Sequence, residues 1–271
     1  MPESRAMTLA ILSALPEEQH GLAALLEDTQ VVARAGRRFV RGHLHGQPLV
    51  LGLTGIGKVA AATTTTTLIE HLDVQQLVFT GVAGGIGAGV QVGDVVVAQA
   101  FLQHDMDVRP LFPRWQVPGY GAAAFACDPT LVQRLQQAAQ ACTAQAATWQ
   151  DPLLGTRAPR AHAGLVVSGD QFIATAEASQ RIVDDLQTAA HAPLAVEMEG
   201  AAIAQVCADY SLPFAAIRTI SDRADDSAHV DFPAFVERIA SRYALHMVSH
   251  LLAHAACSPP ATSHAPYPEG I

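Results

Sequence analysis

Residues 48–82 read PLVLGLTGIGKVAAATTTTTLIEHLDVQQLVFTGV. This stretch begins with an apolar run of strand length, turns at Gly55-Ile56-Gly57, and ends with a second apolar run at Gln76–Val82. We predict a crossover helix over Lys58–Leu72 between the two strands, although its five consecutive threonines favour β structure by propensity. A strand, a helix and a strand in this order are typical of an α/β domain.

The same alternation of short apolar runs and longer helical patterns continues on both sides of this unit. Strands are predicted at Thr8–Leu15, Pro48–Thr54, Gln76–Val82, Asp94–Ala100, Gly164–Ser168, Leu194–Met198 and Phe214–Ile220. Helices are predicted at Glu17–Leu26, Lys58–Leu72, Pro129–Ala141, Glu177–Ala189, Glu199–Tyr210 and Phe232–His254. Together these elements predict an α/β fold with a largely parallel sheet.

Two stretches, Arg109–Phe125 and Thr143–Ala163, are predicted to be long loops. Loops of this length inside a compact domain often act as lids or contact surfaces. No linker divides the chain, so we predict one domain over residues 7–257. Residues 1–6 and the proline-rich end 258–271 are predicted to be disordered.

The composition argues against several classes of partner. Sixteen Lys and Arg residues stand against 25 Asp and Glu, a formal charge of −9, which disfavours nucleic acid and anionic membranes. The most apolar window, residues 195–220, contains charged residues and a proline, so no membrane span is expected. The four cysteines are scattered singly, without the pairing of a zinc site or the density of a disulfide scaffold. A reducing, cytoplasmic compartment fits this pattern.

The start of the chain allows two interpretations. Arg5 followed by apolar residues 7–15 resembles a short signal peptide. We favour a buried first strand, because acidic Glu3 lies where a signal peptide carries positive charge and a helical pattern follows at once.

Acidic residues follow three of the predicted strands, at the strand ends where open α/β sheets bind ligands. Glu17 and Glu18 follow the first strand, where acids in a first helical turn also serve as ordinary caps. Glu197 and Glu199 should share one face of a buried strand, which is costly unless they bind something or one is protonated. Asp222 beside Ser221 suits either general acid catalysis or a helix N-cap.

Two glycine-rich turns and one His/Asp segment have competing interpretations. Gly55-Ile56-Gly57-Lys58 and the segment 80–87 could cradle a ligand with backbone amides, or form tight turns with no ligand. Neither matches a Walker A or a dinucleotide fingerprint. His104-Asp105-Met106-Asp107 could bind a metal, but its alternation and the lack of a second ligand cluster favour a solvated loop. We therefore predict no metal and no cofactor.

Six motifs in register resemble the purine nucleoside phosphorylase and uridine phosphorylase superfamily, and within it the 5′-methylthioadenosine/S-adenosylhomocysteine nucleosidases. The motifs are GIGKVAA at 55–61, TGVAGG at 80–85, VGDVVV at 92–97, VSGDQFI at 167–173, VEME at 196–199 and RTISD at 218–222. The resemblance runs from about Thr8 to His254. It implies a single-domain, three-layer sandwich with a central mixed, mostly parallel sheet flanked by helices.

The resemblance also implies catalytic roles. Asp222 matches the acid that protonates adenine N7, with Ser221 beside it, and Glu18 matches the base that activates water. The remaining substrate contacts implied are Glu199 and Met198 at the ribose, Arg218 near the water and Glu199, Phe172 stacked on adenine, Ile173 at the adenine edge, and Ala83 and Gly84 in the glycine-rich turn. Glu17 resembles an unreactive neighbour of the base.

Two positions, Phe79 and Val82, bear on whether water or phosphate is the nucleophile. Bacterial phosphorylases of this superfamily hold phosphate with an arginine at the position of Phe79 and a serine nearby. A phosphate dianion beside Phe79 and near Glu18 would be unpaired and repelled, so water is the expected nucleophile. Val82 replaces the serine usual in the nucleosidases, which removes a hydroxyl near the sugar and the water.

The 5′ substituent is expected to meet apolar side chains. Leu15, Ile56, Val108 and Phe232 match the family's alkylthio pocket. The resemblance also implies a homodimer in which the Arg109–Phe125 loop comes near the partner's site, where Pro118 would close the pocket.

Hydrolysis of methylthioadenosine, S-adenosylhomocysteine or both is therefore the leading hypothesis. The enzyme alternatives are a related nucleosidase acting on futalosine or AMP, and a purine nucleoside phosphorylase. A non-catalytic nucleoside-binding module is the alternative of another class. The presence of both Glu18 and Asp222 disfavours it, because a binder needs no acid–base pair.

Overall fold

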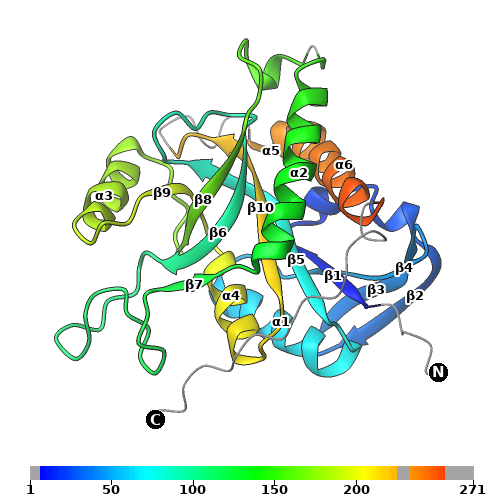
Figure 1. Cartoon of the computed structure of the whole chain (residues 1–271), viewed down its shortest axis with the longest axis horizontal. Coiled ribbons are helices and arrows are strands. Elements are labelled where there is room, and N and C mark those ends of the chain that lie inside the picture. Colours follow the sequence, from blue (N-terminus) through cyan, green and yellow to red (C-terminus); the bar gives the residue numbers. More distant parts are fainter. Residues whose placement is uncertain (1–6, 150, 225–231, 254–271) are drawn as a thin grey trace.

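The computed structural model describes residues 7–149, 151–224 and 232–253. The expectations for the two ends, residues 1–6 and 258–271, lie outside these ranges. The described residues form a mixed sheet with helices packed against it, which is the predicted fold class (Figure 1). No helix among the described residues is both long and apolar enough to cross a membrane.

The sheet contains all seven predicted strands and three more. The strands are β1 (Leu9–Ser13), β2 (Glu27–Arg34), β3 (Arg37–Leu44), β4 (Gln47–Leu53), β5 (Gln76–Gly85), β6 (Val95–Gln103), β7 (Ala124–Ala126), β8 (Ala161–Ser168), β9 (Pro193–Glu197) and β10 (Phe214–Asp222). Their order is β10-β6-β8-β9-β5-β1-β4-β3-β2, with β7 on β6 and a further pairing of β10 with β5. The β5–β10 pairing closes one part of the sheet into a ring of five strands.

The strand directions are more mixed than the sequence indicated. The pairings β1–β4, β1–β5, β5–β10, β6–β8 and β8–β9 are parallel. As many pairings are antiparallel, and three of them involve strands that the sequence analysis missed. Because β1, β5 and β10 run parallel side by side, their carboxyl ends meet at one edge and bring distant residues together.

Two helix pairs pack on the sheet, α1 with α4 and α2 with α6 (Figure 1). The helices are α1 (Lys58–Leu72), α2 (Pro129–Ala146), α3 (Ala176–Gln187), α4 (Gly200–Asp209), α5 (Phe232–Phe235) and α6 (Ser241–Ala253), and a π turn at Val236–Ala240 joins the last two. The helix predicted over Phe232–His254 thus contains a π turn, and its last residue lies outside the described part. Helix α2 continues five residues past its predicted end, from Ala141 to Ala146.

The threonine run in α1 is helical, as predicted. Thr63, Thr64, Thr65 and Thr67 each donate their hydroxyl to the carbonyl four residues earlier, at 2.8–2.9 Å. These bonds satisfy the side chains inside the helix, so their low propensity is overcome by local hydrogen bonds and by burial against the sheet.

The prediction of a helix over Glu17–Leu26 is wrong. The segment forms two short 3-10 turns, Pro16–Gln19 and Ala23–Leu25. Gly21 lies between them at φ +87°, which ends a right-handed helix. The Glu18 side chain also turns back to accept the amides of Ala14 and Leu15, so it fixes the strand end rather than starting a helix.

The missed hairpin β2–β3 is almost entirely exposed along β2, so it carries no apolar alternation. Positive φ angles at Ala35-Gly36 and His45-Gly46 close the two tight turns that join β2, β3 and β4. A glycine at each turn was the only local signal. The hairpin extends the sheet away from the site.

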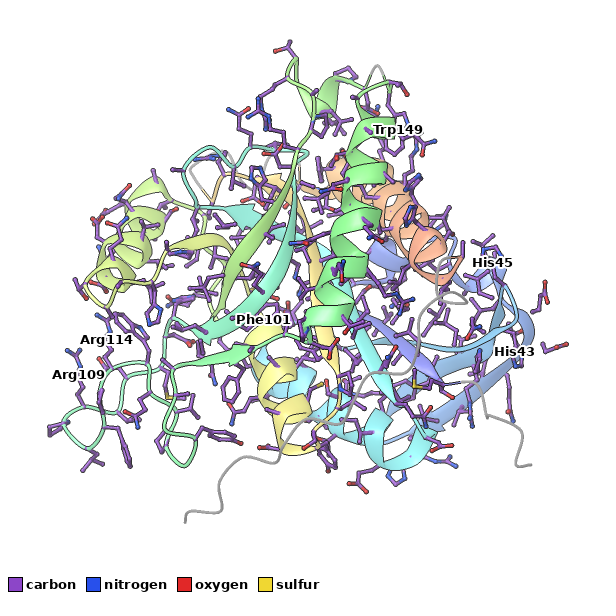
Figure 2. The ribbon with its side chains drawn as sticks, in the orientation of Figure 1. His43, His45, Phe101, Arg109, Arg114 and Trp149 are labelled. Carbon is purple, nitrogen blue, oxygen red and sulfur yellow. The ribbon has the colours of Figure 1, made fainter. Side chains whose placement is uncertain are left out.

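The two predicted loops are partly structured. The Arg109–Phe125 segment ends in β7 and projects from the body of the protein, with Arg109 and Arg114 on it (Figure 2). Within it Trp115 is buried and donates Nε1–H to the carbonyl of His104 at 3.0 Å. The Thr143–Ala163 segment begins inside α2, contains a 3-10 turn at Pro152–Leu154 and ends in β8.

Candidate active site

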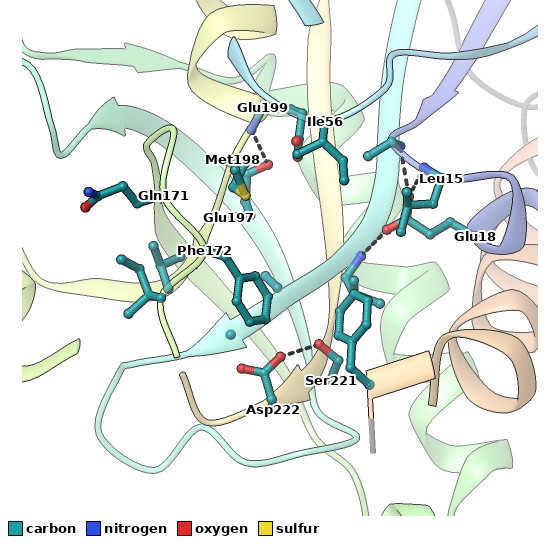
Figure 3. A pocket seen from close by; sticks show the side chains of 17 residues that line it. Leu15, Glu18, Ile56, Gln171, Phe172, Glu197, Met198, Glu199, Ser221 and Asp222 are labelled. Atoms are coloured by element: carbon teal, nitrogen blue, oxygen red, sulfur yellow. Dashed lines mark hydrogen bonds between the residues drawn. The ribbon is translucent and has the colours of Figure 1, made fainter. Parts of the chain in front are cut away.

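A pocket lies at the edge where β1, β5, β9 and β10 end (Figure 3). The predicted site residues that line it are Leu15, Glu18, Ile56, Ala83, Gly84, Phe172, Ile173, Met198, Glu199, Ser221, Asp222 and Phe232. Glu18, Glu199 and Asp222 reach the pocket from different sides, as Figure 3 shows. The topology thus gathers acids that are separated by some two hundred residues.

Glu18 is a buried carboxyl held by main-chain amides. Its Oε2 accepts from Ala14 at 2.8 Å and Leu15 at 2.9 Å, and its Oε1 accepts from Val82 at 2.9 Å. Burial raises the pKa of Glu18, although the charge of Arg218 and these amides act in the opposite direction. A carboxyl with a raised pKa is suited to proton exchange near neutral pH. Glu17, in contrast, is exposed.

Asp222 ends β10 with its side chain fixed by neighbours. Oδ2 accepts the hydroxyl of Ser221 at 2.7 Å and Oδ1 accepts the amide of Ala224 at 2.8 Å. Gly84 allows this approach, because a Cβ there would meet Asp222 Oδ1 at 3.0 Å and the Ala224 Cβ at 2.9 Å. Asp222 is 8% exposed, so its carboxyl lines the pocket with little contact with solvent.

Glu197 and Glu199 do not behave as two equal members of one strand face. Strand β9 ends at Glu197, whose Oε2 accepts from Arg218 Nη2 at 2.5 Å and whose Oε1 accepts from Ser168. Glu199 lies beyond the strand, and its Oε1 accepts the amide of Gly57 at 2.8 Å. The ion pair with Arg218 therefore compensates the negative charge of Glu197, which lowers the energetic cost of burying two neighbouring carboxylates.

The pKa of Glu199 is raised by this arrangement. Burial and the neighbouring charge of Glu197 raise the pKa of Glu199 to about 8, against the Gly57 amide and Arg218, which lower it. The protonated form of Glu199 is thus favoured at neutral pH. Protonation of one acid is one of the two ways, beside ligand binding, in which the sequence analysis expected this cost to be relieved.

Arg218 lies behind the pocket instead of lining it. Its side chain is 1% exposed, and its guanidinium carbon sits 3.6 Å from the centre of the Phe79 ring. A Cβ on Gly81 would lie 2.6 Å from both Arg218 Nη1 and Glu18 Oε1, so the arginine and the base converge on that glycine. Arg218 pairs directly with Glu197, and its charge also acts on Glu199, whose pKa it lowers.

The aromatic wall of the pocket is open to solvent. Phe172 is 51% exposed, and its ring packs edge-on against Phe232 with centroids 6.1 Å apart. Ile56, which is 59% exposed, lies at the mouth. Exposed apolar groups around a concave acidic site provide contact area for an apolar or aromatic ligand.

Besides Arg218, two predicted residues, Val108 and Pro118, do not line the pocket of this chain. Their expected roles involve the long loop and a partner subunit, and they stay predictions. The residues missed in the prediction of the site are Ala14, Val82, Gln171, Val196 and Glu197. Val82, Gln171, Val196 and Glu197 lie within the quoted motifs, whereas Ala14 lies at the end of the first predicted strand. The motif positions and that strand end were therefore the available signals.

The His104–Asp107 segment contributes ion pairs. Asp105 accepts Lys58 Nζ at 2.6 Å, and Asp107 pairs with Arg109. Across the described ranges, no group of three or more His, Cys, Asp or Glu side chains has the geometry to hold a metal ion. The structure therefore gives these acids a pairing role.

The sequence and the fold are similar to those of known proteins. A family model described as the phosphorylase superfamily matches residues 8–253. The 5′-methylthioadenosine/S-adenosylhomocysteine nucleosidase of Chromohalobacter salexigens is 39% identical over 238 residues, which cover 88% of this chain and 93% of that protein.

Solved structures agree with this match. A nucleosidase of the same name from Neisseria meningitidis, in complex with methylthio-immucillin-A, has a TM-score of 0.78 and 34% identity, covering 90% of this chain and 98% of the other. The futalosine hydrolase of Helicobacter pylori has a TM-score of 0.78 and 28% identity, covering 92% and 98%.

Proposed function

The chain belongs to the phosphorylase superfamily, and we propose that it hydrolyses the N-glycosidic bond of 5′-methylthioadenosine, S-adenosylhomocysteine or both. The products are adenine and the 5′-thio-substituted ribose. The observation that carries the proposal is that Glu18 and Asp222 line different sides of one pocket and that Glu199 lines a third side. The nucleosidase from Chromohalobacter supports the choice of substrates.

The reaction follows from these three acids. Asp222 donates a proton to adenine N7 while the bond between C1′ and N9 breaks and its electron pair passes to the base. Glu18 takes a proton from water, and the water oxygen bonds to C1′. Glu199 binds the ribose hydroxyls, whose hydrogen bonds strengthen as positive charge develops on the sugar.

Water, and not phosphate, is the nucleophile in this proposal. The buried cation next to the general base Glu18 is Arg218, and Arg218 already forms an ion pair with Glu197 at 2.5 Å. Phe79 covers the other side of its guanidinium. A phosphate dianion would therefore meet Glu18 with no unpaired cation among the described residues that line the pocket.

The test is release of adenine from methylthioadenosine in phosphate-free buffer. We expect a rate that does not rise when phosphate is added, and 5-methylthioribose as the second product in place of 5-methylthioribose 1-phosphate. Adenine release only in the presence of phosphate would establish the phosphorylase alternative. Absence of turnover with tight nucleoside binding would establish a binding module.

Futalosine is the second candidate substrate, because the Helicobacter pylori futalosine hydrolase has the same fold. A panel of methylthioadenosine, S-adenosylhomocysteine, adenosine and futalosine separates the candidates. The apolar lining by Leu15, Ile56 and Phe232 favours the alkylthio substrates. A kcat/KM for futalosine above that for methylthioadenosine would reverse this choice.

A cytoplasmic homodimer belongs to the same proposal. The Arg109–Phe125 loop exposes Leu111 at 81% and Phe112 at 39%, and apolar side chains on a projecting loop suit a subunit contact. Light scattering of the purified protein tests the dimer, and the double variant L111S/F112S is expected to weaken it. A monomer of full activity would remove the proposed role of Pro118 at the partner's site.

A further inference from the structure

The N-terminus of α1 binds two acids that come from distant segments. Its cap residue, Gly57, has no side chain, so the first amides of the helix need acceptors from elsewhere. The amide of Gly57 donates to Glu199 Oε1 and the amide of Lys58 donates to Asp170 Oδ1, both at 2.8 Å. One helix end therefore holds the segment after β9 and the segment after β8 at once.

The Lys58 side chain joins one of these acids, Asp170, to the end of β6. Its Nζ donates to Asp105 Oδ1 at 2.6 Å and to Gln103 Oε1 at 3.1 Å, and it lies 3.9 Å from Asp170 Oδ2. The amide of Asp170 donates to Asp105 Oδ2 at 3.0 Å. Lys58, Asp105 and Asp170 thus form a closed ring of polar contacts, which we call the Lys58 ring.

The Lys58 ring is partly buried, and its charged groups are paired. Lys58 is only 17% exposed and Asp105 32% exposed at their side chains. Burial opposes ionisation of Asp105, but Lys58 and the Asp170 amide hold the pKa of that carboxyl below its ordinary value. A partly buried ion pair with additional hydrogen bonds fixes geometry better than an exposed pair.

Three connections link the Lys58 ring to the pocket. Asp170 precedes Phe172 and Ile173 by two and three residues, and both line the pocket. Gly57 contacts Glu199 directly. In addition, Gln103 accepts Lys58 and donates to Gln205 of α4, the helix that begins one residue after Glu199.

We propose that Lys58 and Asp170 are positioning residues that hold the base-stacking loop and the sugar-binding Glu199 on one helix end, so that adenine affinity depends on their contact. This inference rests on the proposed function, because it takes Phe172 and Ile173 as the adenine contacts. Neither Lys58 nor Asp170 lines the pocket. Any effect of their substitution on adenine binding therefore passes through the loop.

The experiment is a double-mutant cycle on the dissociation constant of adenine, measured by calorimetry with wild type, K58M, D170A and K58M/D170A. We expect K58M to weaken adenine binding about tenfold and D170A by at least as much, because D170A also removes the acceptor of the Lys58 amide. The double variant should be no weaker than D170A, because both changes break the Lys58 ring. K58R keeps a cation for Asp105 and should retain affinity within about threefold. R181M, which breaks the exposed Arg181–Glu177 pair of α3, is the matched control and should leave affinity unchanged.

Specific outcomes overturn the inference. Wild-type adenine affinity in K58M, or a double variant weaker than D170A by the full effect of K58M, as independent effects would give, would show that the ring does not position the loop. Thermal melting checks that each variant is folded, and D105N, which removes the anion that holds Lys58, serves if K58M does not fold. An active wild type with unaffected K58M binding refutes this inference alone, whereas a wild type that neither binds adenine nor hydrolyses methylthioadenosine refutes the proposed function with it.

Discussion

The Arg218 guanidinium carbon lies 3.6 Å from the centre of the Phe79 ring while the Nη2 of the same group binds Glu197. This position of Phe79 corresponds to the phosphate-binding arginine that the family resemblance assigns to bacterial phosphorylases. The aromatic ring thus occupies the place of a cation and orients another cation towards a carboxylate. The stacking of a desolvated arginine on an aromatic face contributes roughly 2 kcal/mol.

Replacing Phe79 with Leu should therefore cost more than loss of apolar volume. We expect F79L to reduce the free energy of unfolding by about 1–2 kcal/mol more than F39L, a change at an equally buried phenylalanine of β3. We also expect kcat/KM to fall about tenfold in F79L alone, because Arg218 loses its orientation near Glu18. Urea unfolding and adenine release measure the two effects, and equal losses in both variants would remove any special role of the stacking.

The substitution Asp222→Asn tests the general acid. Asn keeps the size and can still accept the Ala224 amide, so nucleoside binding should change little. Loss of the proton donor should reduce kcat by about 10²–10⁴-fold. Asp184→Asn, on the exposed face of α3, is the control for removal of one acidic group. A kcat in Asp222→Asn equal to that of the control would refute the assignment.

Val82 offers a test of how the water is held. Its amide binds Glu18 at 2.9 Å and its side chain lines the pocket, so a hydroxyl there would lie near the base. We expect V82S to exceed V82A in kcat/KM by about fivefold, the effect of one hydrogen bond worth about 1 kcal/mol. V82A is the necessary reference because both changes remove the valine methyl groups. Equal rates in V82S and V82A would show that a hydroxyl at this position does not assist the water.

The sequence predicted the buried elements well because burial leaves a pattern. All seven predicted strands exist, and α1 begins and ends at the predicted residues. The exposed strand β2 left no such pattern. The acids after β1 were mistaken for a helix start because an acid that caps a helix and an acid that accepts the amides of a strand end look alike in sequence. The resemblance located most of the pocket through its motifs.

The sequence did not predict which charged side chains pair with one another inside the site. Alternation along a strand placed Glu197 and Glu199 on one face, but β9 ends at Glu197 and the chain then turns into α4. The ion pair of Glu197 with Arg218 depends on the register of β10 against β5, which brings Arg218 level with Gly81. Such pairing is a property of the assembled sheet, and no single motif contains it.

The titration of Glu199 gives a prediction for stability. Its pKa in the folded protein is about 8, above the ordinary carboxyl value of 4.5, because of burial and the charge of Glu197. Between these two values the folded state keeps a proton that the unfolded state has released. The free energy of unfolding should therefore fall as the pH rises from about 4.5 to about 8. Burial of Glu18 raises its pKa too and acts in the same direction.

E199Q removes the titration of Glu199 and should flatten the decline. We expect the loss of unfolding free energy between pH 5 and pH 8.5 to be smaller in E199Q than in wild type by roughly 1–4 kcal/mol, since one pKa unit corresponds to about 1.4 kcal/mol. Urea midpoints at the two pH values measure it, with E177Q on the exposed face of α3 as the control that should keep the wild-type slope. A slope in E199Q as steep as in E177Q would mean that Glu199 is ionised in the folded protein, and that Glu197 does not hold a proton on its neighbour.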